Sequence, residues 1–171
     1  DAEGAVVRTM PVPADRAVVA AALPRFLGRQ LQTPPRHAAL KHRGRAYYDW
    51  ARAGVEIPRP PREVEIRALD VLDWREPDLV LAVACSKGTY IRVLAEDLGV
   101  AAGSCAHLAA LRRTSTGGFR LADAVTLERL EAMTSAERAA CLLPVDALVQ
   151  GMPRIDLPES EAVRFVIADI P

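Results

Sequence analysis

One stretch, residues 78–99, constrains the fold of this chain more than any other feature. Its first part, residues 78–84, is an apolar run that includes Val80 and Val83, which predicts a buried strand. Its last part repeats apolar side chains at helical spacing, which predicts a helix that Gly99 ends as its C-cap. The chain is therefore expected to form a strand, a short connection and a helix in direct succession.

The connection between these two elements, residues 86–89, is polar. Gly88 suits a tight turn, the hydroxyls of Ser86 and Thr89 are candidates to cap the helix, and Lys87 adds a cation. The end of a strand at a helix N-terminus is a common place to bind an anion. The complete phosphate-loop word G-x-x-x-x-G-K-[ST] is absent, because Lys87 comes before its glycine. From the residues alone, an ordinary strand–turn–helix and an anion-binding turn both stay open.

Charge is divided unevenly along a chain whose formal net charge is zero. Residues 25–67 hold ten Arg or Lys against four Asp or Glu, a net of +6. Residues 121–171 hold four against nine, a net of −5. This division is consistent with one cationic face on a neutral protein, and scattered surface charge is the alternative. Half of the 171 residues are apolar, enough for one well-buried domain.

The three cysteines, Cys85, Cys105 and Cys141, are widely spaced and lack the C-x-x-C or His-rich spacing of a metal site. We expect them to be reduced and buried, and we expect no metal. No run approaches the roughly twenty apolar residues that span a bilayer, and the N-terminus lacks a signal-peptide layout. These observations predict a soluble, cytoplasmic protein without a membrane partner.

The first half of the chain is expected to hold a short strand, a helix and a long hairpin. Residues 5–7 predict the strand, and residues 14–27 a packing helix that Pro24 kinks and Gly28 ends. Residues 33–42 predict a loop and residues 55–61 a proline-rich connector. Alternation over residues 62–74 predicts a strand that pairs with residues 78–84 as an antiparallel hairpin.

The second half is expected to be simpler. Residues 104–114 read as a strand or extended segment closed by Gly117 and Gly118. Residues 124–133 predict a helix that Thr126 N-caps, and residues 135–140 a shorter one. Residues 151–171 are too short and proline-marked to form a domain.

Basic and aromatic residues are concentrated in residues 41–50. Lys41, His42, Arg43 and Arg45 are followed by Tyr47, Tyr48 and Trp50. Such a mixture suits phosphate contacts beside base stacking, as in RNA-binding surfaces. The alternative places Tyr48 and Trp50 in the core and leaves the cations in solvent.

Two pairs of sequence words, in order and at matching separation, point to a known family. One pair is Cys-Ser-Lys-Gly-Thr-Tyr-Ile-Arg (residues 85–92) with Ala-His-Leu-Ala-Ala-Leu-Arg-Arg-Thr (residues 106–114). The other is Pro-Pro-Arg-His-Ala-Ala-Leu-Lys (residues 34–41) with Gly-Arg-Ala-Tyr-Tyr-Asp-Trp-Ala-Arg-Ala-Gly (residues 44–54). Shorter words at residues 1–4 and 142–146 also match. Over nearly its whole length the chain resembles the TruB family of tRNA pseudouridine-55 synthases.

The resemblance implies an α+β fold with a mixed, mainly antiparallel sheet and packing helices. Residues 1–150 would be an incomplete catalytic domain and residues 151–171 the remnant of a C-terminal RNA-binding extension. The implied activity is isomerisation of uridine to pseudouridine in the T-loop of tRNA, in which the glycosidic bond breaks, the base rotates and a carbon–carbon bond forms. The implied enzyme is a monomer that binds the tRNA T-stem-loop and needs no metal, redox or nucleotide cofactor.

The resemblance also implies roles for particular residues. Arg92 matches the arginine that pairs with the catalytic aspartate, and Tyr90 a tyrosine of the base pocket that helps in proton transfer. His37 takes the place of a residue that stacks on the target base, and Leu111 matches an apolar residue against that base. The cations predicted to face RNA are Lys41, Arg43, Arg45, Lys87, Arg112 and Arg113.

Two departures from the family pattern carry expectations of their own. The Gly-x-Leu-Asp-Pro-x-Ala-x-Gly type motif that holds the catalytic aspartate does not occur in these 171 residues. We therefore expect a fragment that is inactive alone, because the pairing cation lacks its carboxylate. The family usually has a tyrosine where this chain has His37, which predicts altered affinity in the base pocket.

Three other functions compete with a stand-alone synthase. One is a non-catalytic RNA-binding module that uses the basic region, residues 25–67. A second is an acyl- or phosphate-handling enzyme with Cys85 as nucleophile, which the sequence disfavours because no His partner is evident. A third is a related synthase that works with guide RNA, although residues 95–99 and 106–114 look more like the stand-alone bacterial form.

Overall fold

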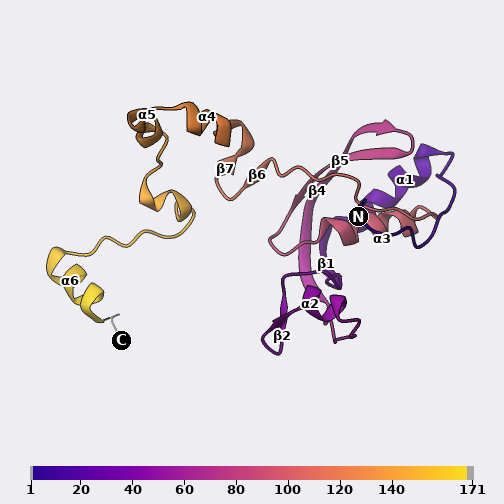
Figure 1. Ribbon diagram of the computed structural model, residues 1–171, viewed down its shortest axis with the longest axis horizontal. Helices are drawn as coiled ribbons and strands as arrows, with labels where there is room; N and C mark the ends of the chain where they lie inside the picture. Colours follow the sequence, from indigo (N-terminus) through magenta and orange to yellow (C-terminus); the bar gives the residue numbers. More distant parts are fainter. Residues whose placement is uncertain (1, 169–171) are drawn as a thin grey trace. The chain divides into compact units, whose positions relative to one another are not determined.

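In a computed structural model, the chain divides into two compact units, Asp1–Leu111 and Arg112–Pro171 (Figure 1). The structure describes residues 2–168, and side chains up to residue 163. Asp1 of the N-terminal word and the end of the predicted C-terminal remnant, residues 169–171, thus lie outside the described residues. Among the described residues every strand pairing is antiparallel, and helices pack on the main sheet, so the predicted α+β class is confirmed. The division at residue 150 stays a prediction.

The first unit is built on a long hairpin of β4 (Arg62–Arg75) and β5 (Asp78–Cys85). The alternating pattern of β4 and the apolar run of β5 predicted this hairpin. Glu76 and Pro77 connect the two strands. β1 (Gly28–Gln32) pairs with the other edge of β4, so the strand order is β1-β4-β5. β1 was not predicted, because its Arg and two Gln side chains give it no apolar alternation. Pairing with β4 makes this segment a strand.

The predicted helix over residues 14–27 forms two shorter elements. α1 (Arg16–Ala22) begins after Asp15, whose carboxylate accepts a hydrogen bond from the Ala17 N–H at 2.8 Å. It continues as a 3₁₀ turn, η1 (Leu23–Phe26), with a proline in its first turn. Val19 and Ala22 are the buried residues of α1, whereas Val18 is exposed.

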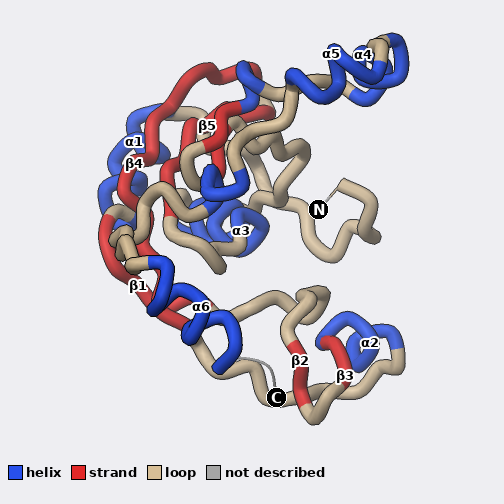
Figure 2. The backbone as a smooth tube through the Cα atoms, turned by 90° about the vertical axis from the view of Figure 1, so that its left-hand side faces the viewer, coloured by secondary structure: helices blue, strands red, loops and turns tan. Residues whose placement is uncertain are grey.

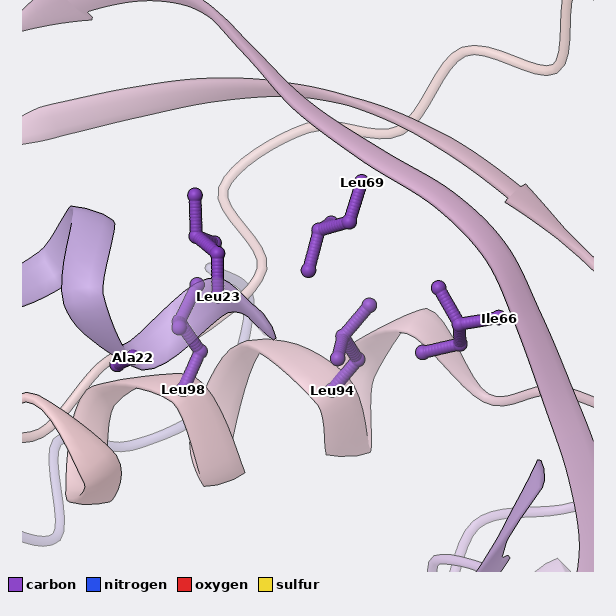
Figure 3. Close-up of a cluster of buried hydrophobic side chains, with 6 residues drawn as sticks. All are labelled: Ala22, Leu23, Ile66, Leu69, Leu94 and Leu98. Carbon is purple, nitrogen blue, oxygen red and sulfur yellow. The ribbon is translucent and has the colours of Figure 1, made fainter. Parts of the chain in front are cut away.

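One face of the sheet packs against α1, η1 and α3 (Ile91–Ala101), which is the helix predicted after β5. Figure 3 shows side chains from these elements converging. Full burial of one Leu or Ile side chain contributes about 1.5–3 kcal/mol, so this cluster is the main core of the unit. Its members are Ala22, Leu23, Ile66, Leu69, Leu94 and Leu98.

Gly99 does not end α3, which corrects the predicted C-cap. The helix runs two residues further, and Gly103 follows it in the left-handed region at φ 74°. Gly99 is instead buried where the chain crosses back over the helix. A Cβ at Gly99 would lie 2.4 Å from the backbone nitrogen of Ala106. This glycine is therefore needed for close packing of two segments.

β2 (Lys41–His42), β3 (Arg45–Ala46) and α2 (Tyr47–Arg52) form a small substructure whose elements lie together in Figure 2. Arg43 and Gly44 make the two-residue turn of the β2–β3 hairpin, at φ 51° and 78°. Positive φ at both positions is the mark of a type I′ turn, which fits the twist of a hairpin. No element was predicted over residues 47–52, where an aromatic-rich sequence has little helical propensity of its own.

The second unit consists of short elements. A two-stranded hairpin that was not predicted turns at Gly117 and Gly118. Thr126 N-caps α4 through the Arg129 N–H, and α5 covers residues 135–140, both as predicted. No side chain of the described residues 112–163 is buried. The elements in order are β6 (Ser115–Thr116), β7 (Phe119–Arg120), η2 (Leu121–Asp123), α4 (Leu127–Ala132), α5 (Ser135–Ala140), η3 (Val145–Leu148) and α6 (Glu159–Ala168).

Several smaller expectations were wrong. Residues 5–7 form no strand. Residues 104–114, predicted as a strand or extended segment, form no strand, and Cys105 and Ala106 lie against Gly99 of α3. All three cysteines are free thiols, but Cys141 is exposed and the other two are only partly buried. Within the described part of the chain, no helix has the length and apolar character needed to cross a membrane.

Candidate functional site

The turn between β5 and α3 is held to β4 by its own hydroxyls. The Ser86 N–H donates to the carbonyl of Glu65 at 2.8 Å, and the Ser86 Oγ accepts from the Glu65 N–H at 3.0 Å. The Thr89 hydroxyl donates to the Ser86 carbonyl at 2.9 Å, across a turn in which Gly88 has φ 84°. The predicted tight-turn glycine is thus confirmed. The predicted capping was wrong, because both hydroxyls brace the turn instead of the helix.

Tyr90 is the N-cap residue of α3, and no side chain from its own turn caps it. The side-chain amide of Gln32, at the end of β1, pairs with its backbone instead. Gln32 Oε1 accepts from the Tyr90 N–H at 2.7 Å, and Gln32 Nε2 donates to the Tyr90 carbonyl at 3.1 Å. Gln32 is only 6% exposed, so both polar groups of a buried amide are satisfied by one residue. Sequence reasoning missed Gln32, since nothing in a polar segment marks one glutamine as buried.

Arg92, in the first turn of α3, reaches the loop that follows β1. Its Nη2 donates to the backbone carbonyl of His37 at 2.7 Å. This contact joins one sequence word from each of the two pairs that carry the family resemblance, residues 34–41 and 85–92. Tyr90, Arg92 and His37 therefore belong to one region of the first unit.

The loop that carries His37 is anchored from several sides. Pro34 is fully buried, and Arg59 Nη1 donates to its carbonyl at 2.8 Å. Arg36 forms an ion pair with Glu56, and the carbonyl of Ala38 accepts from the N–H of Tyr48. The side chain of His37 itself is exposed. A well-fixed backbone therefore presents an accessible imidazole.

The β2–β3 hairpin and α2 combine cations with aromatic rings. The Arg45 guanidinium lies 4.8 Å from the ring centroid of Trp50 and donates to the carbonyl of Asp49 at 2.9 Å. The Arg52 guanidinium lies 5.3 Å from the ring of Tyr48. Such contacts hold a guanidinium over an aromatic face. Of the three aromatic residues here, only Tyr47 is buried, so the core alternative for Tyr48 and Trp50 is not what the structure shows.

The remaining predicted site residues are exposed. Lys41, Arg43 and Arg45 share the hairpin, and Lys87 lies in the turn before α3. Leu111 ends the first unit with 64% of its surface exposed. Arg112 and Arg113 are exposed residues of the second unit. Their predicted roles at the RNA stay predictions.

The Asp97 carboxyl of α3 does not take the place of the missing catalytic aspartate. Burial raises the pKa of Asp97, which makes this carboxyl the obvious candidate. Asp97 is five residues from Arg92, however, and five residues turn an α-helix by about 140° beyond one full turn. Asp97 and Arg92 therefore project from different sides of α3. Among residues 2–168, no group of three or more His, Cys, Asp or Glu side chains is placed to hold a metal ion.

The fold has a counterpart among solved structures. A chain in the crystal structure of a Cbf5-Nop10-Gar1 complex matches with a TM-score of 0.70, over 93% of this chain and 46% of that one. The two sequences are 24% identical, so this likeness concerns the fold alone.

Sequence comparison gives the family. A family model described as TruB family pseudouridylate synthase (N terminal domain) matches residues 1–91, and one described as tRNA pseudouridylate synthase B C-terminal domain matches residues 92–150. A protein of Thiobacillus denitrificans named tRNA pseudouridine synthase B is 54% identical over 165 residues. One of the same name from Dechloromonas aromatica is 52% identical over 165 residues. In both cases the match covers 96% of this chain and 55% of the relative.

The fold and the joined sequence words thus define a pseudouridylate synthase domain. The chain belongs to the TruB family. It spans about half the length of the curated relatives it matches.

Proposed function

We propose that the whole protein isomerises uridine to pseudouridine in the T-loop of tRNA, as a cytoplasmic monomer that binds the T-stem-loop. The observation that carries this proposal is the hydrogen bond from Arg92 to the carbonyl of His37. It brings together residues 34–41 and 85–92, one sequence word from each pair, in one region of a chain that belongs to the TruB family.

In this proposal Arg92 pairs with the catalytic aspartate of the family, whose motif does not occur within these 171 residues. A guanidinium has five N–H donors, so a bond to the His37 carbonyl is compatible with holding a carboxylate. A neighbouring cation lowers the pKa of a carboxyl group and keeps it ionised near the ribose. Tyr90 and His37 then serve the flipped base, Tyr90 in proton transfer and His37 by stacking, with Leu111 as an apolar contact.

The β2–β3 hairpin is proposed to contact the RNA backbone. Lys41, Arg43 and Arg45 offer three exposed cations on one small element, beside the aromatic faces of Tyr48 and Trp50. Lys87, Arg112 and Arg113 are proposed to add further phosphate contacts. Phosphate contacts of this kind make affinity fall steeply with salt.

The proposal is tested on the full-length protein with a T-stem-loop RNA that carries 5-tritiated uridine at the T-loop target. Isomerisation replaces the C5–H bond by a C5–C1′ bond, so tritium is released to solvent. The same RNA labelled at a stem uridine is the matched control and should release none. Binding of the RNA without release would contradict the proposal and favour a non-catalytic RNA-binding module. Sedimentation of the full-length protein checks the monomer, and fractionation of cells the cytoplasmic location.

A further inference from the structure

The start of α3 is fixed by a side chain from another element. A helix leaves its first N–H groups without partners inside the helix, and the residue before it usually supplies a cap. Tyr90 holds that position here and makes no side-chain cap. Its carbonyl accepts from the N–H groups of Val93 and Leu94, each at 3.1 Å, and its own N–H is bonded by Gln32.

The Gln32 amide forms a two-point contact. One hydrogen bond would let Tyr90 pivot, whereas a pair to its N–H and its carbonyl fixes both the position and the orientation of that peptide segment. Gln32 is itself held by β1, whose pairing with β4 places it opposite Arg62. The side chain of Gln32 thus fixes the N-terminus of α3 relative to the sheet.

Gln32 is also the last residue of β1, directly before the loop that contains His37. Four residues separate Gln32 from His37, and Arg92 returns from α3 to the His37 carbonyl at 2.7 Å. A closed loop of contacts therefore results. It runs from Gln32 along the chain to His37, through the hydrogen bond to Arg92, and back along the first turn of α3 to Tyr90 and Gln32. A change at Gln32 alters the relation between Tyr90, Arg92 and His37 without touching any of their side chains.

We propose that Gln32 is a positioning residue for the isomerisation: its buried amide sets where Tyr90 and Arg92 stand relative to His37. This inference rests on the proposed function. Displacing a catalytic group by about 1 Å can cost about 100-fold in rate, so loss of the amide should lower kcat far more than it raises KM.

The test compares Gln32→Met with Gln30→Met in the full-length protein. Methionine keeps the size of glutamine and removes its hydrogen bonds. Gln30 lies two residues earlier on β1 and also donates from Nε2 to a backbone carbonyl, that of Phe26, at 2.6 Å. Among the described residues, the Gln30 amide forms no hydrogen bond with α3. Gln30→Met therefore shows the effect of losing a side-chain amide hydrogen bond on β1 that does not involve α3. Gln32→Asn keeps the amide but shortens its reach.

Four quantities are measured: kcat and KM for tritium release, the melting temperature, and the rate of hydrogen–deuterium exchange in peptides covering residues 89–94. We expect kcat to fall about 10- to 100-fold in Gln32→Met and Gln32→Asn, with KM changed less than about threefold. Exchange at residues 89–94 should become about fivefold faster, the factor for one net hydrogen bond. Gln30→Met should change kcat less than about twofold at a similar loss of thermal stability.

Equal losses of kcat in Gln32→Met and Gln30→Met would overturn the inference, because they would show only a general effect of destabilised β1. Unchanged kcat in Gln32→Met would overturn it as well. A wild-type protein that releases no tritium would instead refute the proposed function, and with it any role for Gln32 in isomerisation. The exchange measurement would then still decide whether Gln32 holds the α3 N-terminus.

Discussion

Gly99→Ala gives a prediction whose sign depends on the tertiary structure. In an isolated helix, alanine is favoured over glycine by about 1 kcal/mol. Here a Cβ at residue 99 would lie 2.4 Å from the nitrogen and 2.8 Å from the Cβ of Ala106, and 2.8 Å from the carbonyl carbon of Cys105. Real Cβ atoms do not come so close, and two of the three opposing atoms belong to the backbone.

The crossing segment must therefore move, and it is held in place. The N–H of Ser104 donates to the Gly99 carbonyl at 2.9 Å, and the Ser104 hydroxyl donates to the Pro11 carbonyl at 2.7 Å. Overpacking of this kind costs about 1–3 kcal/mol. We take the upper part of that range because backbone atoms are involved, and subtract the gain in helix propensity. The net expectation is a loss of about 1–2 kcal/mol, or about 2–8 °C in melting temperature for a protein of this size.

Thermal unfolding of the full-length protein, followed by circular dichroism, measures the effect. Gly118→Ala is the control: a Cβ there meets nothing within 4 Å and the φ of Gly118 lies outside the positive region, so neither overpacking nor backbone strain opposes alanine. Gly99→Ala should be the more destabilising of the two. A Gly99→Ala protein as stable as the wild type, or more stable, would refute the reasoning, because helix propensity would then outweigh the contact.

Three further predictions concern the site and the second unit. Arg92→Lys keeps the charge but loses the forked geometry that binds a carboxylate and the His37 carbonyl together, so tritium release should slow about 100-fold; a change of less than about threefold would contradict the proposed role. Arg43→Asn removes one cation from the hairpin while keeping a residue that tolerates positive φ, so the slope of log affinity against log salt should fall by about 1 at an unchanged melting temperature; an unaltered slope would exclude a phosphate contact there. Hydrogen bonds from the backbone N–H and hydroxyl of Thr134 lower the pKa of Glu137, so this capping interaction is present above the ordinary carboxyl pKa and is lost as pH falls through the lowered value. Carboxyl NMR titration should show the Glu137 pKa rising in Thr134→Ala, and a pKa that does not move would disprove the assignment.

The elements that the sequence predicted well are those whose signal is local. Alternation along β4 and the apolar run of β5 are properties of the strands themselves, and they placed the hairpin to within a residue or two. The spacing from Ile91 to Leu98 likewise predicted α3. Thr126 and residues 135–140 were recognised because N-caps and short helices depend on neighbouring residues only.

Only part of the candidate site could be predicted from the sequence. Family words pointed to Tyr90, Arg92 and His37 and to the hairpin cations, and their proposed chemistry rests on that resemblance. The structure adds that Arg92 donates a hydrogen bond to the backbone carbonyl of His37. It also adds Gln32, whose importance depends on a partner 58 residues away in the chain.

By itself, then, the sequence of this protein determined its hairpin, its long helix, its caps and its family, because each of these is encoded in residues near one another or in whole words. Only the tertiary structure decided that residues 28–32 are a strand, that Gly99 serves a backbone crossing and that a buried glutamine holds Tyr90. The physical reason is the same in each case. Strand pairing, close approach and satisfaction of a buried amide are properties of two segments in contact, and neither segment carries a signal of them alone.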